Sequence, residues 1–422
     1  MGMVARGMCI SGKDPTLTKG EELKRNWLLL LTALLGGAML PIPIYSVSLF
    51  MESWGREFGW SRPEMGLANS SFTIAMVVAA PITGRLIDRF GSRAPAMISL
   101  LLLAGMFAAT SLVNEQIWTL YAAYALLAFA GSGTSPIAFT KTVCAYFERA
   151  RGLALGITVT GTALASLLTP LVVAATIENY GWHGSWIAFS LLSLALFPLL
   201  FLGLKDPARP TPRGAGDEES PAAPLAGRSL SEVVRTRGFW LMGGGFFLTS
   251  TAILAAIAHM TPILRGSGLS TEAAILLQSL MGIGLIFGRL LCGYIVDRVF
   301  APLVFQMICA MGAAGFLLLA LQGGAVTSAI GVVLVGAAMG AEYDLVAYLV
   351  SRYFGMAHYG RIYGWQYAFT MLGGVAGPFI IGGLYAGTGD YLVYLLLAAA
   401  MLVIAALLLR GLGPYPRSFD AS

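Results

Sequence analysis

The sequence predicts an all-α membrane protein with twelve transmembrane helices in two pseudo-symmetric six-helix bundles. Three observations predict this fold class. Hydrophobic residues make up 57% of the 422 residues and charged residues only 11%, whereas a soluble chain carries about a quarter charged residues. The apolar residues gather into stretches of about 18 to 25 residues, each long enough to cross a bilayer core of about 30 Å. A polar stretch in the middle of the chain separates six of these from six more.

The apolar stretches can be placed in order along the chain. They follow a polar N-terminal segment without the apolar core of a secretory signal peptide, so no cleaved leader is expected. The first six predicted helices span residues 27–51, 66–86, 94–113, 117–141, 152–176 and 184–204. The other six span residues 239–262, 273–295, 302–321, 325–350, 363–386 and 391–410.

The polar stretch KDPARPTPRGAGDEESPAAPLAGRSLSEVV is rich in Pro, Gly, Ser and charge. Such a composition cannot bury a core and is typical of a mobile linker. The predicted organisation is a cytoplasmic N-terminal segment (1–26), a first bundle (27–204), a cytoplasmic linker (205–236), a second bundle (237–410) and a cytoplasmic tail (411–422).

Lys and Arg concentrate on one side of the predicted membrane. With both termini in the cytoplasm, cytoplasmic segments hold 22 of the 26 basic residues, as the positive-inside rule requires. The net charge of +5 therefore reflects topology, and no nucleic-acid partner is expected. The four cysteines show no paired spacing, so neither a disulfide framework nor a metal site is expected.

Two landmarks repeat along the chain. An Asp-Arg pair follows the second and the eighth predicted helix, at Asp88 and Asp297, which are 209 positions apart. A Tyr-Phe pair follows the fourth and the tenth, at Tyr146 and Tyr353, which are 207 positions apart. Because the two landmarks repeat at nearly the same separation, they indicate a duplicated six-helix unit. Transporters built from such halves bind substrate near the membrane midplane.

At these landmarks the chain resembles the major facilitator superfamily. The stretch GRLIDRFGSR resembles the loop motif between helices 2 and 3 of that superfamily, and YFERARGLALGITVTG is similar to the helix 4–5 signature of monocarboxylate transporters and their bacterial relatives. Arg289, four residues before Gly293, matches the position of that family's substrate-binding arginine. The resemblance implies the major facilitator fold, alternating access and an organic monocarboxylate as substrate.

The chain departs from the family pattern at three places. Leu285 stands where animal members carry an acid, which leaves the proton carrier unassigned by the resemblance. Thr370 stands near the helix 11 lysine of oxalate–formate exchangers, which disfavours a dicarboxylate. Thr169-Pro170 replaces the Gly-Pro pair of antiporters, which disfavours drug export.

Arg289 is a permanent cation inside a predicted transmembrane helix. It lies eight residues before Asp297, which places it about 12 Å inside the membrane boundary. Insertion of such a residue costs about 2.5–3.5 kcal/mol. A guanidinium fits a carboxylate with two hydrogen bonds, so an organic anion is the natural ligand. The alternative is a structural ion pair between helices.

Glu342 and Asp344 are the two acids deep inside a predicted helix, and they are the candidate proton carriers. Asp344 matches the depth of Arg289, counted from Arg352 at the end of its helix. At 100° per residue the two acids point about 200° apart, so only one can face a given cavity. The alternative is a fixed pair that holds the helix in place.

Several uncharged polar residues are candidate substrate contacts, although each is also compatible with helix packing. They are Tyr45, Asn69, Tyr124, Gln366 and Tyr367. Lys141, near the cytoplasmic end of helix 4, either attracts anions on the inner side or extends to the interface.

The loop motifs predict a gate on the cytoplasmic side. Its candidate residues are Gly84, Asp88, Arg89, Gly91, Arg93, Asp297 and Arg298. We expect Asp88 to form a charge network with Arg89 and Arg93 that holds this side closed.

The sequence therefore predicts a monomeric proton-coupled symporter of a small organic monocarboxylate in the plasma membrane, the inner membrane of a bacterium. An exchanger of organic anions of the oxalate–formate type is the alternative, and drug efflux is a third. The substrate is either aliphatic or aromatic. No nucleophile–base constellation, phosphate loop or metal-ligand cluster is present in the sequence, so no enzymatic activity and no cofactor are expected.

Overall fold

The computed structural model describes residues 18–206 and 227–416, which are almost entirely helical. Most of the predicted N-terminal segment and parts of the predicted linker and tail lie outside the described residues. The first half comprises α1 (Lys19–Arg25), α2 (Trp27–Gly37), α3 (Ile42–Phe58), α4 (Arg62–Phe90), α5 (Arg93–Thr110), α6 (Ile117–Gly131), η1 (Ser132–Thr134), α7 (Pro136–Tyr146), α8 (Arg151–Val159) and α9 (Gly161–Gly203). The second comprises α10 (Leu230–Val233), α11 (Arg237–Gly266), α12 (Thr271–Val296), α13 (Ala301–Ala320), α14 (Ala325–Tyr353), α15 (Tyr359–Thr388) and α16 (Leu392–Arg410).

Eleven segments of the described chain are long and apolar enough to cross a membrane. One of them, Arg151–Gly203, has 53 residues, about twice what a single crossing needs. Within it Gly181 adopts φ 62° and ψ −172°, a conformation open to glycine but strained for other residues. The helix breaks there and crosses twice, so the chain makes the predicted twelve crossings.

Three of the predicted helices are interrupted. The predicted helix 27–51 divides into α2 and α3 just before Pro41 and Pro43, and 117–141 divides at η1, just before Pro136. Proline lacks the N–H that continues a helix, so breaks at these positions are expected from the residue chemistry. The third break separates α8 from α9 at Thr160, where no proline stands.

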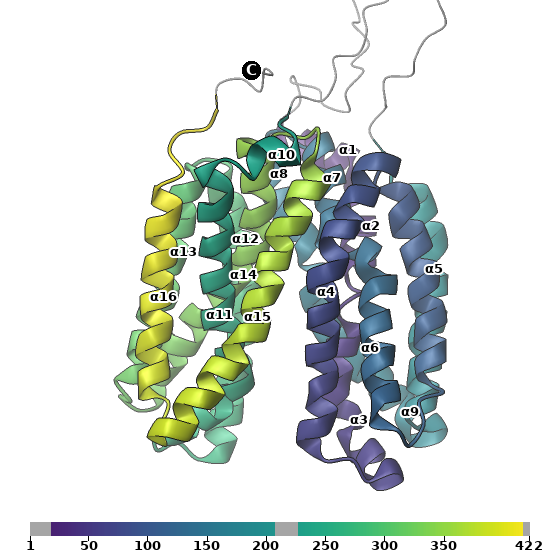
Figure 1. Ribbon diagram of the computed structural model, residues 1–422, viewed down its shortest axis with the longest axis vertical. Coiled ribbons are helices and arrows are strands. Elements are labelled where there is room, and N and C mark those ends of the chain that lie inside the picture. The colour runs from purple at the N-terminus through teal and green to yellow at the C-terminus, as the bar shows by residue number, and fades with distance from the viewer. Residues whose placement is uncertain (1–17, 207–226, 417–422) are drawn as a thin grey trace, which may run out of the picture.

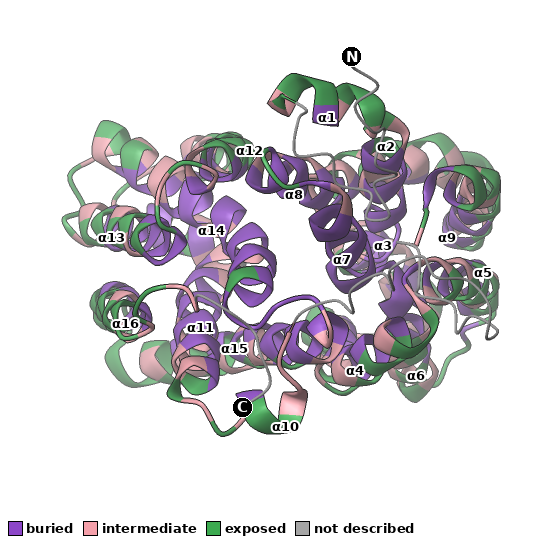
Figure 2. Ribbon diagram, turned by 90° about the horizontal axis from the view of Figure 1, so that it is seen from above, coloured by how far each residue is buried: buried purple, intermediate pink, exposed green. Residues whose placement is uncertain are grey.

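The helices form two groups, α2–α9 and α11–α16 (Figure 1). The described chain begins and ends at the same end of the molecule, where α1 and α10 also lie; we call this the terminal end and the opposite one the distal end. At the boundary between the groups, α4 packs against α15 and α8 against α12 (Figure 2). Helices α4 and α15 are close near the terminal end and diverge toward the distal end (Figure 1).

Glycines allow the two halves to touch through their backbones near the terminal end. A Cβ atom on Gly84 would lie 2.0 Å from the carbonyl oxygen of Gly360, and one on Gly152 would lie 2.4 Å from that of Gly293. Neither position can carry a side chain without separating the helices. The two contacts are related by the sequence repeat, since Gly152 and Gly360 are 208 positions apart.

Candidate functional site

Arg289 lies between the two halves of the molecule. Its side chain is 2% exposed, although it belongs to a membrane-spanning helix, α12. Nε donates to the carbonyl of Gly340 at 3.0 Å, within the same half. Nη1 reaches the first half, where it donates to the Val159 carbonyl at 2.8 Å and to Thr162 Oγ1 at 3.1 Å. The cation is therefore held by neutral acceptors from both halves.

The break between α8 and α9 provides one of these acceptors. Helix α8 ends at Val159, and the last carbonyls of a helix lack an intrahelical donor and carry partial negative charge. The Nη1 group of Arg289 satisfies such a carbonyl. On the other side, Gly340 allows α14 to approach α12, because a Cβ there would lie 2.1 Å from the carbonyl oxygen of Leu285.

Asp344 is the acid that faces Arg289. Its Oδ1 lies 3.9 Å from Arg289 Nε, and both side chains are 2% exposed. Within the described chain neither Asp344 oxygen has a hydrogen-bond partner. Gly156 of α8 lies beside the pair, since a Cβ there would lie 3.6 Å from Asp344 Oδ2. The pair is thus close enough for strong attraction, but no hydrogen bond between the two charges fixes it.

Glu342 points elsewhere, as the helical spacing predicts. It is 1% exposed, and its electrostatic neighbours include Cys309 on α13, inside the second half, and the adjacent Tyr343. Both Glu342 oxygens lack a hydrogen-bond partner among the described residues, and no ion pair to Glu342 is found within that part of the chain. Of these two buried acids, therefore, only Asp344 has a cation beside it in the described structure.

Tyrosines surround the Arg289–Asp344 pair. Tyr45 of α3 and Tyr343 of α14 lie near enough to Arg289 to interact with it electrostatically, although they come from different halves. The Tyr343 ring lies 5.9 Å from that of Tyr367, which in turn lies 6.2 Å from that of Tyr363. The Tyr363 hydroxyl is buried without a hydrogen-bond partner in the described structure. The site thus has an aromatic wall with hydroxyl groups available to a ligand.

The other predicted contacts lie outside this cluster. Tyr124 is fully buried in the first half. Its hydroxyl donates to the Pro43 carbonyl at 3.2 Å, and its ring packs against Trp186. Asn69 donates to the Ile44 carbonyl at 3.4 Å. Gln366 is buried and donates to the Phe239 carbonyl at 3.0 Å. These bonds join helices within one half, as the packing alternative predicts.

Asp88 joins the two halves at the terminal end, but not through the predicted network. It accepts hydrogen bonds from the backbone N–H groups of Gly360 and Arg361, each at 2.8 Å. These are the second and third residues of α15, whose N–H groups have no helical partner and attract a negative charge. Asp88 is therefore a helix cap supplied by the other half of the molecule.

Asp297 repeats this arrangement. It accepts from the N–H groups of Gly152 at 2.7 Å and Leu153 at 3.5 Å, the second and third residues of α8. Burial raises the pKa of Asp297 even though these bonds and Lys19, 3.6 Å away, lower it. We call Asp88 and Asp297, with the N–H groups that they cap, the terminal gate.

Helix α1 lies over this gate. Glu22, 2% exposed, accepts from the N–H groups of Glu148 at 3.0 Å and Ala150 at 2.9 Å in the turn before α8. Through Lys19 the same short helix reaches Asp297 in the second half. The polar N-terminal segment thus contacts both halves at the terminal end, an arrangement that sequence reasoning missed because nothing in the segment resembles a motif.

The remaining loop-motif residues support the gate locally. A Cβ on Gly91, which has φ +87°, would lie 2.2 Å from Asp206 Oδ2. Arg93 donates to the Phe201 carbonyl at 2.6 Å. The Arg89 and Arg298 guanidinium groups lie over the rings of Phe90 and Tyr294. The predicted charge network of Asp88 with Arg89 and Arg93 is not the one found, because the Asp88 carboxylate bonds to the N–H groups of α15 and to Lys141.

Lys141 also belongs to the gate. Its ammonium group is buried and lies 2.8 Å from Asp88 Oδ1 and 3.2 Å from the Ile87 carbonyl. It therefore neither extends to the interface nor presents an uncompensated charge to an anion, the two roles that its position in the sequence suggests.

A sequence model of the Major Facilitator Superfamily matches residues 27–378. Monocarboxylate transporter 11 of Homo sapiens is 26% identical over 384 residues, which cover 87% of this chain and 78% of that protein. Monocarboxylate transporter 13 of Bos taurus is 26% identical over 283 residues, or 65% of this chain and 62% of that protein.

Solved structures share the fold. The fucose:proton symporter of E. coli superposes with a TM-score of 0.72 at 15% identity, covering 93% of this chain and 99% of that one. The human organic anion transporter MFSD10 superposes with a TM-score of 0.67 at 16% identity, covering 94% of this chain and 100% of that one.

Proposed function

Because this chain belongs to the major facilitator superfamily, we propose that it is a secondary transporter that moves a small organic monocarboxylate together with a proton. The observation that carries the proposal is the Arg289–Asp344 pair, buried between the two halves. A buried guanidinium in a membrane protein is costly and usually marks the path of a charged ligand. Its planar fork matches a carboxylate.

The hydrogen bonds of Arg289 suggest how the anion binds. Nη1 is occupied by two neutral acceptors of the first half, the Val159 carbonyl and Thr162 Oγ1. A carboxylate accepts charge-assisted hydrogen bonds that are about twice as strong as neutral ones. The incoming anion therefore displaces these acceptors, and this loosens the link between the halves that Arg289 provides.

Charge balance couples the anion to a proton. Without substrate, ionised Asp344 compensates Arg289. With substrate, the carboxylate compensates Arg289, and Asp344 is neutral once it holds a proton. Both forms are neutral, whereas binding of either partner alone leaves an unpaired charge in a medium of low dielectric constant. We assign the exchanging proton to Asp344, and Glu342 is the second candidate because it is an equally buried acid on the same helix.

The terminal gate indicates from which side of the membrane a substrate reaches Arg289. The positive-inside rule places the terminal end in the cytoplasm, so the conformation described above is closed to the inside. The proposed location is the plasma membrane, the inner membrane if the protein is bacterial. Transport then requires that α15 leave Asp88 and that α8 leave Asp297, as one half rocks against the other.

Reconstitution tests this function. The purified protein is placed in proteoliposomes with an empty lumen, and uptake of labelled aliphatic and aromatic monocarboxylates is measured with the outside either at the pH of the lumen or about one pH unit more acidic. A symporter accumulates its substrate only with the inward proton gradient. An exchanger takes up label only into vesicles loaded with a second carboxylate. Absence of gradient-driven uptake of every acid would contradict the proposal.

The gate makes a separate prediction. Replacing Asp297 by alanine removes a helix cap worth about 1 kcal/mol, so opening at the terminal end is expected to become about five-fold more populated. Asp88→Ala also leaves buried Lys141 without its counter-charge, so its effect is expected to be larger. The check is the rate at which Cys144, which is buried in α7, reacts with a maleimide in inside-out vesicles. Asp390→Ala is the matched control, because Asp390 accepts from Leu392 N–H within its own half. It belongs to the connection between α15 and α16, which lies at the distal end (Figure 1). Equal labelling rates in all variants would refute the gate.

A further inference from the structure

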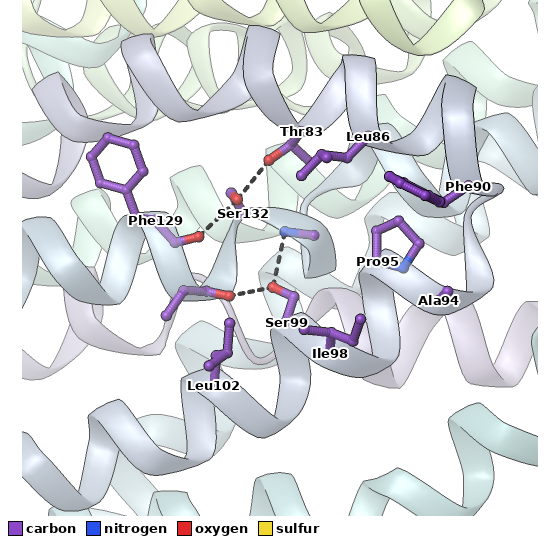
Figure 3. Close-up of a pocket in the computed structure, with 12 residues that line it drawn as sticks. Thr83, Leu86, Phe90, Ala94, Pro95, Ile98, Ser99, Leu102, Phe129 and Ser132 are labelled. Carbon is purple, nitrogen blue, oxygen red and sulfur yellow. Dashed lines mark hydrogen bonds between the residues drawn. The ribbon is translucent and has the colours of Figure 1, made fainter.

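A crevice opens on the side of the first half, away from Arg289. It lies between α4, α5, α6 and η1 and has a volume of about 300 Å³ (Figure 3). Its walls include Leu86, Ile98, Leu102 and Phe129, which are between 43% and 59% exposed. In a membrane-spanning bundle, such exposed apolar side chains face lipid. The crevice is therefore open to the acyl chains of the bilayer.

The floor of the crevice offers no polar group to a ligand. Thr83 Oγ1 donates to Ser132 Oγ at 2.6 Å, and Ser132 Oγ donates to the Phe129 carbonyl at 2.8 Å. Ser99 Oγ accepts from the Gly133 N–H at 2.9 Å and donates to the Ala130 carbonyl (Figure 3). The hydroxyl groups of α4, α5 and η1 thus bond to one another and to backbone groups at the break between α6 and α7. A polar or charged solute gains nothing here, whereas a hydrocarbon chain does.

The rim of the crevice at the terminal end is cationic. Phe90 lines the crevice, and the Arg89 guanidinium carbon lies 5.2 Å from the centre of its ring. Arg85, one turn earlier on α4, is exposed. Basic residues at this depth attract the phosphates of anionic lipids.

We propose that this crevice binds one anionic phospholipid of the leaflet at the terminal end. One acyl chain fills the space between α4, α5 and α6, and the phosphate lies at Arg85 and Arg89. The site is distinct from the proposed substrate site and does not depend on the identity of the substrate. It has a structural consequence, because Thr83, Leu86 and Phe90 form one face of α4 and the gate residues Gly84 and Asp88 lie on the opposite face. A chain in the crevice therefore supports the helix that presents Asp88 to α15.

Native mass spectrometry of the intact protein tests the proposal. The probes are phosphatidylglycerol and phosphatidylcholine with identical palmitoyl and oleoyl chains, titrated into delipidated protein. We expect one tight site that prefers phosphatidylglycerol. Ala94→Phe places a ring in the crevice from an exposed position on its wall, and it is expected to weaken binding of both lipids at that site at least five-fold. Ala109→Phe, on an exposed position of the same helix but outside the crevice, is expected to bind like the unmodified protein.

A second variant separates the headgroup from the acyl chain. Arg85→Gln combined with Arg89→Gln is expected to reduce the preference for phosphatidylglycerol by about five-fold for each arginine, while phosphatidylcholine binding is retained. Equal lipid binding by the Ala94→Phe and Ala109→Phe variants would overturn the crevice as the site. An unchanged headgroup preference in the double arginine variant would overturn the assignment of the phosphate.

Discussion

Replacing Arg289 by lysine is expected to reduce carboxylate uptake at least 50-fold while the protein still folds. Lysine keeps the charge but loses the planar fork, so it cannot hold both oxygens of a carboxylate while it also contacts Asp344. Loss of charge-assisted hydrogen bonds in a buried site costs about 1.5–3 kcal/mol each, which corresponds to between one and two orders of magnitude in affinity. The measurement is initial uptake in proteoliposomes over a range of substrate concentrations.

A structural role for Arg289 predicts a different result. If Arg289 only joins helices, its loss would lower the melting temperature, and the fraction that remains folded would transport at the normal rate. The decisive comparison is thermal stabilisation by substrate, which we expect to vanish in the lysine variant. Arg410→Lys is the control, because Arg410 is an exposed arginine at the end of α16. Normal substrate stabilisation of Arg289→Lys would refute the proposed site.

The fold was predictable because its signals are local. Length and hydropathy identify each crossing, and the prolines before α3 and α7 explain two interruptions. The break between α8 and α9 has no such signal, although it exposes the carbonyl that Arg289 uses. The connection between the predicted helices 152–176 and 184–204 includes Gly181, but the conformation of Gly181 was not predicted, since a single glycine within a helical pattern is also compatible with a continuous helix.

The site was predictable only in part, because its contacts are distant in sequence. The depth of Arg289 follows from counting residues along one helix. Its partner Val159, however, is 130 positions away, and nothing in the chain pairs the two. Asp88 illustrates the same limit: it stands in a recognisable motif, yet its partners are backbone N–H groups 272 and 273 positions on. Every residue type has a backbone N–H group except proline, so the sequence does not show which of these groups Asp88 bonds to. The motif instead suggested that Asp88 pairs with the arginines close to it in sequence.

The helical period predicted that Glu342 and Asp344 point apart, but not which of them faces the cation. That depends on which helices flank α14, and helix neighbours are set by the packing of the whole bundle. The structure places Asp344 beside Arg289 and Glu342 near Cys309. This difference in position is what allows the two acids to be distinguished by experiment.

Asp344→Asn is expected to abolish the response of uptake to a proton gradient while exchange of substrate across the membrane continues. A gradient of one pH unit is worth about 1.4 kcal/mol and sustains about ten-fold accumulation by a one-to-one symporter. Asparagine can neither take up nor release the proton, so the gradient no longer drives the substrate. Exchange persists because Arg289 stays in place through its bond to Gly340 and can still release Val159 and Thr162 for a carboxylate.

Glu342→Gln is the matched comparison, since it removes an equally buried acid from the same helix. Glu342 has no cation beside it in the described structure to compensate its charge, so a neutral substitute changes little in the transport cycle. We therefore expect gradient-driven accumulation to persist in Glu342→Gln and to be lost in Asp344→Asn. The reverse result would identify Glu342 as the residue that carries the proton. Anion and proton transport would then be coupled through a conformational change of α14, and not through the charge of Arg289.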